Sequence, residues 1–203
     1  LAMHARLDDL NRAGLFRDAG DAGLRLRTGI AAGQLMVGDF GCPPYRSSYT
    51  VLGDAANLAA RLEVVNKQLG SKTLVSRRVW ELAGGAFYWR AIGRVRLRGR
   101  QGAEEVFELL STKTPDAGEP AEARERMDMR LTLTGQGVRA YSSGAFDEAA
   151  SLFDRIFIEF GDDQLSRVYR SALSRWRSKI DAPVSMEKLA EAGFDGTIDP
   201  SDA

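Results

Sequence analysis

Residues 49–63 constrain this chain more than any other stretch, because they specify an extended run, a glycine turn and a helix in direct succession. Gly53 can supply a backbone angle that other residues resist. We expect Asp54 to cap the following helix, since its carboxylate can accept hydrogen bonds from the free N–H groups of the first turn. Apolar residues at positions 55, 58, 62, 65 and 69 then recur at helical spacing and predict a helix over 54–69 that ends at Gly70.

Asn57 and Arg61 lie four residues apart and therefore share a second face of this helix. An amide and a guanidinium held side by side on a rigid helix can bind a charged oxygen. Taken alone, the pair is also what an ordinary solvent-exposed polar face of a helix looks like. The surrounding motifs must decide between these two interpretations.

Composition excludes several classes of function. The 203 residues carry 28 basic and 28 acidic side chains, and this net charge of zero argues against a nonspecific binder of nucleic acid or of membrane surfaces. Cys42 is the only cysteine, so an intramolecular disulfide is excluded, and His4 is the only histidine, which excludes a histidine-rich metal site. No apolar run reaches the ~18 residues of a membrane helix, so we expect a cytoplasmic chain without a membrane segment.

Strands and helices alternate up to about residue 110, which is typical of an α/β arrangement. Residues 24–30 alternate apolar and polar side chains, and we expect them to form a hairpin with 34–40. Further extended runs are expected at 49–52, 73–75, 87–97 and 105–110. Gly93 lies inside one of them and predicts a turn or bulge.

Residues 111–121 have the composition of a linker, and the pattern beyond them is helical only. Helices are expected at 122–142, 145–159, 163–179 and 185–192. Residues 141–153 have the small-residue and aromatic spacing of a tetratricopeptide hairpin, although one hairpin is fewer than the roughly three repeats that such arrays need. We therefore expect 122–203 to be a helical extension that packs on the first domain or docks a protein partner.

Four motifs in the first 110 residues resemble, in order and in spacing, the second half of the class III nucleotidyl cyclase catalytic domain. They are residues 28–33, 37–41, 49–63, and 97–100 followed by 105–109. The resemblance implies an α+β, ferredoxin-like cyclase fold over 1–110, present in part, with a mixed and mostly antiparallel sheet. It also implies conversion of ATP or GTP to the cyclic 3′,5′-monophosphate and pyrophosphate.

The resemblance assigns a role to four residues. Arg61 would stabilise the charged α-phosphate in the transition state, and Asn57 would orient the ribose. Thr50 matches the position that contacts the purine, and threonine there favours ATP over GTP. Arg98 matches a lysine that commonly holds the triphosphate, and arginine keeps the charge while changing the geometry.

Family members bind two Mg²⁺ or Mn²⁺ ions through two aspartates in an earlier, phenylalanine-rich block that this sequence does not contain. The chain has other aspartates near its start, and we interpret these as surface or turn residues: Asp8, Asp9, Asp18, Asp21 and Asp39. In the family the sites form between the subunits of a head-to-tail homodimer. We therefore expect this chain to carry half of a composite site, to hold no metal itself and to be inactive alone.

The sequence begins inside an apparent helix without an initiator methionine, which predicts a longer protein with upstream strands and an unpaired sheet edge in their place. Residues 162–169 are similar to the extension of bacterial cyclases that have a membrane-anchored sensor upstream. The resulting hypothesis is an adenylate cyclase of signal transduction. The alternative is a non-catalytic cyclase-fold module that binds nucleotide or a protein partner.

Overall fold

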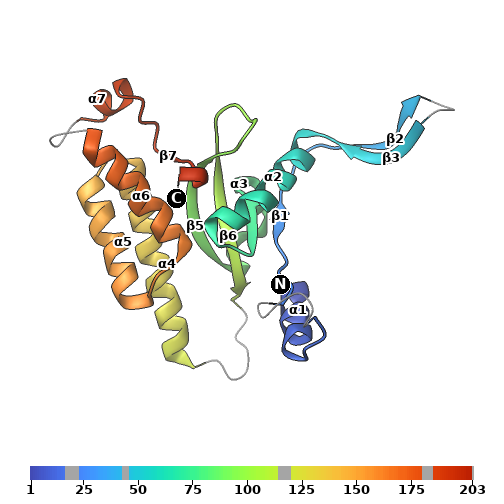
Figure 1. Cartoon of the computed structure of the whole chain (residues 1–203), viewed down its shortest axis with the longest axis horizontal. Helices are drawn as coiled ribbons and strands as arrows, with labels where there is room; N and C mark the ends of the chain where they lie inside the picture. The colour runs from blue at the N-terminus through green and yellow to red at the C-terminus, as the bar shows by residue number, and fades with distance from the viewer. Residues whose placement is uncertain (17–22, 43–45, 114–119, 180–184, 203) are drawn as a thin grey trace.

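The computed structural model describes residues 1–16, 23–42, 46–113, 120–179 and 185–202. Asp18, Asp21 and most of the expected linker 111–121 lie outside these ranges. The elements, shown in Figure 1, are α1 (Ala2–Arg12), β1 (Thr28–Ile30), β2 (Met36–Cys42), β3 (Arg46–Leu52), α2 (Asp54–Leu69), β4 (Thr73–Ser76), α3 (Arg77–Ala83), η2 (Gly84–Ala86), β5 (Phe87–Arg96), β6 (Ala103–Thr112), α4 (Ala121–Ser142), α5 (Phe146–Phe160), α6 (Gln164–Lys179), α7 (Met186–Glu191), β7 (Thr197–Ile198) and η3 (Pro200–Asp202).

The central sheet has five strands in the order β1-β4-β6-β5-β7. β1 pairs with β4 and β7 pairs with β5 in parallel, whereas β4–β6 and β6–β5 are antiparallel. The expected mixed sheet of an α+β fold is therefore confirmed. Within the described ranges β1 and β7 each have a single pairing partner and form the two edges of the sheet, and pairing of either edge with upstream strands stays a prediction.

The expected hairpin between 24–30 and 34–40 is wrong. β2 pairs with β3 in a separate two-stranded ribbon, which projects away from the body of the molecule in Figure 1. β1 instead lies beneath α2, so closely that a Cβ at Gly29 would overlap the backbone of Ala59 and Glu63. Periodicity alone cannot distinguish a strand with a nearby antiparallel neighbour from one whose parallel neighbour follows a helix.

Helix α2 spans the predicted residues, and its apolar face is buried, with Leu62 and Leu69 fully inaccessible. It ends at Gly70, which has the left-handed backbone of a C-terminal glycine cap (φ +64°). The predicted cap at Asp54 is wrong, because Gly53 occupies the cap position and Asp54 is already helical. The Asp54 carboxylate accepts a hydrogen bond from Arg100 at 2.8 Å instead.

The bulge predicted at Gly93 is confirmed by a shift of register between β5 and β6 at Ala91 and Gly93. Gly93 has a φ of +99°, and a Cβ there would collide with the hydroxyl of Tyr169. That hydroxyl donates a 2.7 Å hydrogen bond to the Ile92 carbonyl. The absence of a side chain at Gly93 thus leaves space for the Tyr169 side chain of α6 beside β5.

The expected helical region after 121 is confirmed as α4 to α7, and it shares a hydrophobic core with the sheet. Tyr141 of α4, Phe153 of α5 and Tyr169 of α6 are fully buried, and the Tyr169 ring stacks on Phe153 at 4.5 Å between centroids. β7 was not predicted. It brings Ile198 of the C-terminal segment into this core beside β5.

Candidate functional site

A groove of about 870 Å³ lies between α2, the turn after β5 and η3. It is lined by Asn57, Ala60, Arg61, Val64, Val65, Gln68, Arg96, Leu97, Arg98, Gly99, Arg100, Asp199, Pro200 and Ser201. Three of the four predicted site residues, Asn57, Arg61 and Arg98, therefore lie on the walls of one groove although they come from separate segments. Such a volume is typical of small-molecule sites.

Local structure explains why these side chains meet. The buried face of α2 leaves Asn57 exposed and Arg61 half-buried on the groove side. The turn after β5 is closed by a hydrogen bond from the Arg100 N–H to the Leu97 carbonyl, and Gly99 has a left-handed backbone (φ +71°). A Cβ at Gly99 would lie 3.7 Å from Arg61 Nη2, so the guanidinium reaches the turn that carries Arg98.

The groove is strongly basic. Arg100 has acidic partners, with Asp54 at 2.8 Å and Glu104 at 3.6 Å. Partial burial raises the pKa of the Glu104 carboxyl, and the nearby Arg100 opposes that shift. Arg61 and Arg98, by contrast, make no ion pair within the described part of the chain. Two arginines without acidic partners facing one groove form an anion-binding arrangement.

Thr50, the fourth predicted residue, lies elsewhere. It is in β3, opposite Gly38 of β2, and its side chain is exposed on the projecting ribbon. It does not line the groove. The structure therefore brings together the residues predicted to hold ribose and phosphate, and places the residue predicted to contact the purine on a separate element.

The wall made by residues 199–201 was not predicted from the sequence. Asp199 turns the chain here, because its carboxylate accepts hydrogen bonds from Ser201 N–H at 2.9 Å and from Ser201 Oγ at 2.6 Å. Contacts between η3 and both α2 and α6 hold the turn beside the groove. The sequence pattern after residue 182 does not indicate that residues 199–201 lie beside the groove. Their position depends on the pairing of the two residues of β7 with β5, about a hundred positions earlier in the chain.

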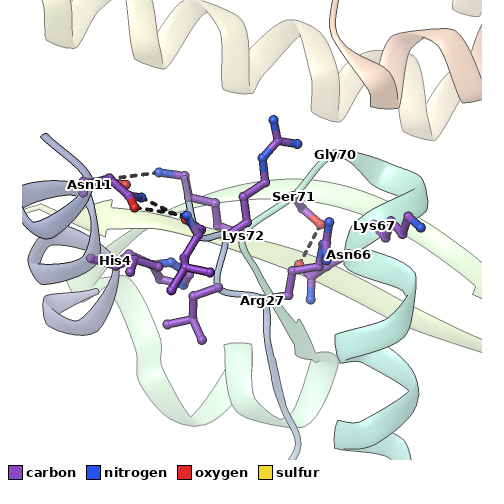
Figure 2. A pocket seen from close by; sticks show the side chains of 13 residues that line it. His4, Asn11, Arg27, Asn66, Lys67, Gly70, Ser71 and Lys72 are labelled. Atoms are coloured by element: carbon purple, nitrogen blue, oxygen red, sulfur yellow. Dashed lines mark hydrogen bonds and ion pairs between the residues drawn. The ribbon is translucent and has the colours of Figure 1, made fainter. Parts of the chain in front are cut away.

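A second pocket of about 350 Å³ lies between α1, residues 24–27 and the end of α2 (Figure 2). Asn66 lies fully buried at its wall and donates hydrogen bonds to the carbonyls of Thr28 (3.0 Å) and Leu62 (2.9 Å), while Ser71 Oγ donates to Asn66 Oδ1 (2.8 Å). Both amide N–H groups and the amide oxygen therefore have partners, one in β1, one in α2 and one in the turn after α2, which makes Asn66 a structural residue.

In the described part of the chain, no group of three or more His, Cys, Asp or Glu side chains is arranged to hold a metal ion. No site for the two divalent ions expected from the family is thus evident among the described residues. No helix in the described ranges combines the length and apolar character needed to cross a bilayer.

The chain is similar in sequence to known adenylate cyclases. Over 125 residues the chain is 34% identical to Adenylate cyclase 1 of Rhizobium meliloti, which covers 60% of this chain and 18% of the relative. It is 27% identical over 144 residues to the terminal-differentiation-specific adenylate cyclase of Dictyostelium discoideum, covering 70% of this chain and 6% of the relative. The chain thus spans less than a fifth of the length of these relatives.

A solved structure, that of the adenylyl cyclase CyaB from P. aeruginosa, is similar at 26% identity and a TM-score of 0.46, over 58% of this chain and 57% of that chain. The family model for the adenylate and guanylate cyclase catalytic domain matches residues 2–111, more than half of the sequence. The chain therefore belongs to the class III adenylate and guanylate cyclase catalytic domain family.

Proposed function

We propose that this chain carries the ribose- and phosphate-binding half of an adenylate cyclase site. The observation that carries the proposal is the groove that unites Asn57, Arg61 and Arg98, in which both arginines lack an acidic partner among the described residues. Their charge is available to a polyphosphate. The reaction that we propose is the one implied by the family to which the chain belongs.

In that reaction the ribose 3′ oxygen forms a bond to the α-phosphorus, the bond from that phosphorus to the bridging oxygen of the β-phosphate breaks, and pyrophosphate leaves with the electron pair. Negative charge grows on the phosphoryl oxygens and on the leaving group. In our proposal Arg61 donates hydrogen bonds to the α-phosphoryl oxygens, Asn57 orients the ribose, and Arg98 holds the departing phosphates. Such fixed donors act without reorganising during the reaction.

We propose ATP as the substrate. Thr50 is the threonine that favours ATP in the resemblance, and the two curated relatives are named as adenylate cyclases. Because Thr50 lies outside the groove, its contact with the purine requires that the ribbon and the groove face the same nucleotide in the assembled protein.

We propose a homodimer through the cyclase domain, with the metal ligands supplied by residues other than those described here. The β2–β3 ribbon supports the dimer, because it exposes apolar side chains on both faces at one of its ends. Val37 and Val51 are cross-strand partners on one face, Met36 and Leu52 on the other, and each side chain is more than 40% exposed. An isolated two-stranded ribbon is marginal in water, and exposed apolar surface of this kind marks an interaction site.

The proposal is tested in the natural full-length protein, with ATP and GTP assayed side by side in the presence of Mn²⁺. Arg61→Ala should lower the rate of cyclic AMP formation on the order of a hundredfold, because one preorganised donor to transition-state charge is worth ~3 kcal/mol. Arg78→Ala is the matched control. Arg78 is an exposed arginine of α3 outside the groove and should leave the rate unchanged.

Equal rates for Arg61→Ala and wild type would remove Arg61 from the site. A full-length protein that binds ATP but forms no cyclic nucleotide under any metal condition would favour the non-catalytic module. We also expect the 203-residue chain to form no cyclic AMP by itself, and robust turnover by this chain would overturn the half-site assignment.

A further inference from the structure

The C-terminal strap, which we define as residues 194–201, connects the helical region to the groove. Phe194 and Ile198 are buried at 3% and 1% exposure, and β7 pairs in parallel with β5. The Tyr141 hydroxyl of α4 donates a 3.2 Å hydrogen bond to the Thr197 carbonyl. The strap is thus anchored on both sides before residues 199–201 reach the groove wall.

The strap also carries an acidic partner for one groove arginine. Arg96 lines the groove, and its Nη2 lies 2.8 Å from the Asp195 carboxylate. The Thr197 N–H donates a 3.1 Å hydrogen bond to the same carboxylate, and the Thr197 hydroxyl donates another at 2.5 Å. Arg94 strengthens the attachment through a 2.9 Å hydrogen bond from Nη1 to the Asp195 carbonyl. Asp195 is thereby oriented toward Arg96 by three groups outside the ion pair.

The environment of Asp195 favours its ionised form. Partial burial alone would raise its pKa, but the hydrogen bonds from Thr197 and the nearby Arg96 outweigh burial and lower the pKa of Asp195. Arg96 therefore faces a negative charge near neutral pH, whereas Arg61 and Arg98 on the same groove make no ion pair in the described structure, although Asp199 also lines this groove.

We propose that Asp195 is a positioning residue that withholds Arg96 from anions in the groove, so that the C-terminal strap sets the affinity of the groove for a polyphosphate. This inference rests on the proposed function, since it takes the groove to be a triphosphate site. The Arg96–Asp195 pair is half-exposed, with side-chain exposures of 57% and 49%. Exposed pairs of this kind are weak, so a polyphosphate can compete with the single carboxylate for Arg96.

The strap connects the groove to α4 of the helical region. When a polyphosphate takes Arg96, the strap loses its ion pair with β5 but keeps the Arg94 hydrogen bond and the pairing of β7 with β5. It also keeps its attachment to α4 through Tyr141 and through Ser142 Oγ, which donates to the Gly196 carbonyl at 3.5 Å. Occupancy of the groove and docking of the strap then oppose each other. A partner that moves α4 would act on the groove through the same eight residues.

The test is the binding of inorganic tripolyphosphate to the 203-residue chain, measured by titration calorimetry at low ionic strength. Asp195→Asn should lower the Kd about two- to fivefold, the range that corresponds to an exposed ion pair. Asp195→Glu keeps the charge and should bind like wild type. Asp154→Asn is the matched control, because Asp154 pairs with Arg170 on the far helices and has a similar exposure of 56%.

A double-mutant cycle separates a local effect from a general change of charge. If Asp195 acts through Arg96, the gain from Asp195→Asn should disappear in an Arg96→Gln background. A gain no larger than that of Asp154→Asn, a gain that persists without Arg96, or absence of binding by both wild type and Asp195→Asn would each overturn the inference.

Arg61→Ala in the same titration distinguishes the two proposals. Loss of affinity in Arg61→Ala without any gain in Asp195→Asn leaves the proposed function standing and removes the role of the strap. A gain in Asp195→Asn with unchanged affinity in Arg61→Ala keeps the role of the strap and removes Arg61 from the phosphate site.

Discussion

Arg90 and Glu108 face each other on neighbouring strands of the sheet and form a buried ion pair at 2.7 Å, with side-chain exposures of 8% and 7%. Asp163, which precedes α6, joins the pair through Arg90 at 3.4 Å and Arg130 of α4 at 3.2 Å. Its carboxylate also accepts a 3.0 Å hydrogen bond from the Ser166 N–H. The Ser166 hydroxyl donates to the same carboxylate at 3.1 Å. The two strands and the helical region are thus joined by charges that would each be costly to bury alone, although Arg130 Nε is buried without a hydrogen-bond partner among the described residues.

Asp163 makes the stability of the protein depend on pH. Burial by itself raises the pKa of this carboxyl, but Arg90, the Ser166 N–H and Arg130 outweigh burial and hold the pKa below its usual value. A carboxyl with a lowered pKa in the folded state stabilises the fold above its unfolded pKa of about 3.9, and the contribution is lost as the pH falls through the folded value.

We therefore expect Asp163→Asn to lower the free energy of unfolding by roughly 1–3 kcal/mol at pH 7. The difference from wild type should shrink as the pH falls from 5 toward 2, as measured by urea denaturation at each pH. Asp162→Asn is the control, because the Asp162–Arg167 pair is exposed and worth little. A difference that stays constant over this pH range would contradict the account.

At the scale of elements, the sequence predicted those whose periodicity is long and whose ends have strong local signals. Helix α2 has a regular apolar face and Gly70 at its end, and α4, α5 and α6 were predicted within a few residues. Pairing was not predictable in the same way. The partner of β1 follows a helix, and the partner of β7 lies about a hundred positions away, so neither leaves a local pattern.

In the site, too, the residues with local sequence signals were predicted and those positioned by distant pairing were not. Asn57, Arg61 and Arg98 were identified from ordered motifs, and the groove brings them together. The wall made by residues 199–201 was missed, because it is positioned by tertiary pairing and its own residues are common turn formers. No local pattern in the sequence indicated that the C-terminal segment pairs with β5.

The bulge at Gly93 gives a prediction at this scale. Gly93→Ala should destabilise the fold by roughly 1–3 kcal/mol or more, because φ is +99° and the new Cβ would meet the Tyr169 hydroxyl and Val138. Thermal unfolding of the 203-residue chain measures the effect. Gly85→Ala is the control, since Gly85 has open space and no positive φ. Equal melting temperatures for the two variants would rule out this role for Gly93.

At the scale of the whole molecule, two regions extend beyond the five-stranded sheet in opposite senses. The helices α4 to α6 pack against the sheet and share its core, whereas the β2–β3 ribbon projects from the body with exposed apolar side chains (Figure 1). The helices α4 to α6 therefore bury their apolar faces within the chain. The apolar side chains of the β2–β3 ribbon are exposed in the described structure, and we propose that a second copy of the chain covers them.

Val37→Glu tests this partner. A charge on the exposed apolar part of the ribbon, where Val37 pairs with Val51, should raise the dimer dissociation constant of the full-length protein at least tenfold, since burying one valine is worth ~1.5 kcal/mol or more. Sedimentation equilibrium measures the constant. Leu82→Glu is the control, because Leu82 is similarly exposed on α3, away from the ribbon. Unchanged dissociation in Val37→Glu would exclude the ribbon from the interface.

The hydroxyl of Tyr169, from α6, is hydrogen-bonded to Ile92 at the bulge of β5. Residues beyond the segment that matches the cyclase family are therefore part of the same folding unit. The family match stops at 111, yet Ile92 and Val95 of β5 are inaccessible in a core completed by residues from 133 to 198. A protein cut at the end of the homologous segment would expose this surface to water. A cyclase module taken from this protein for engineering should therefore end after the strap.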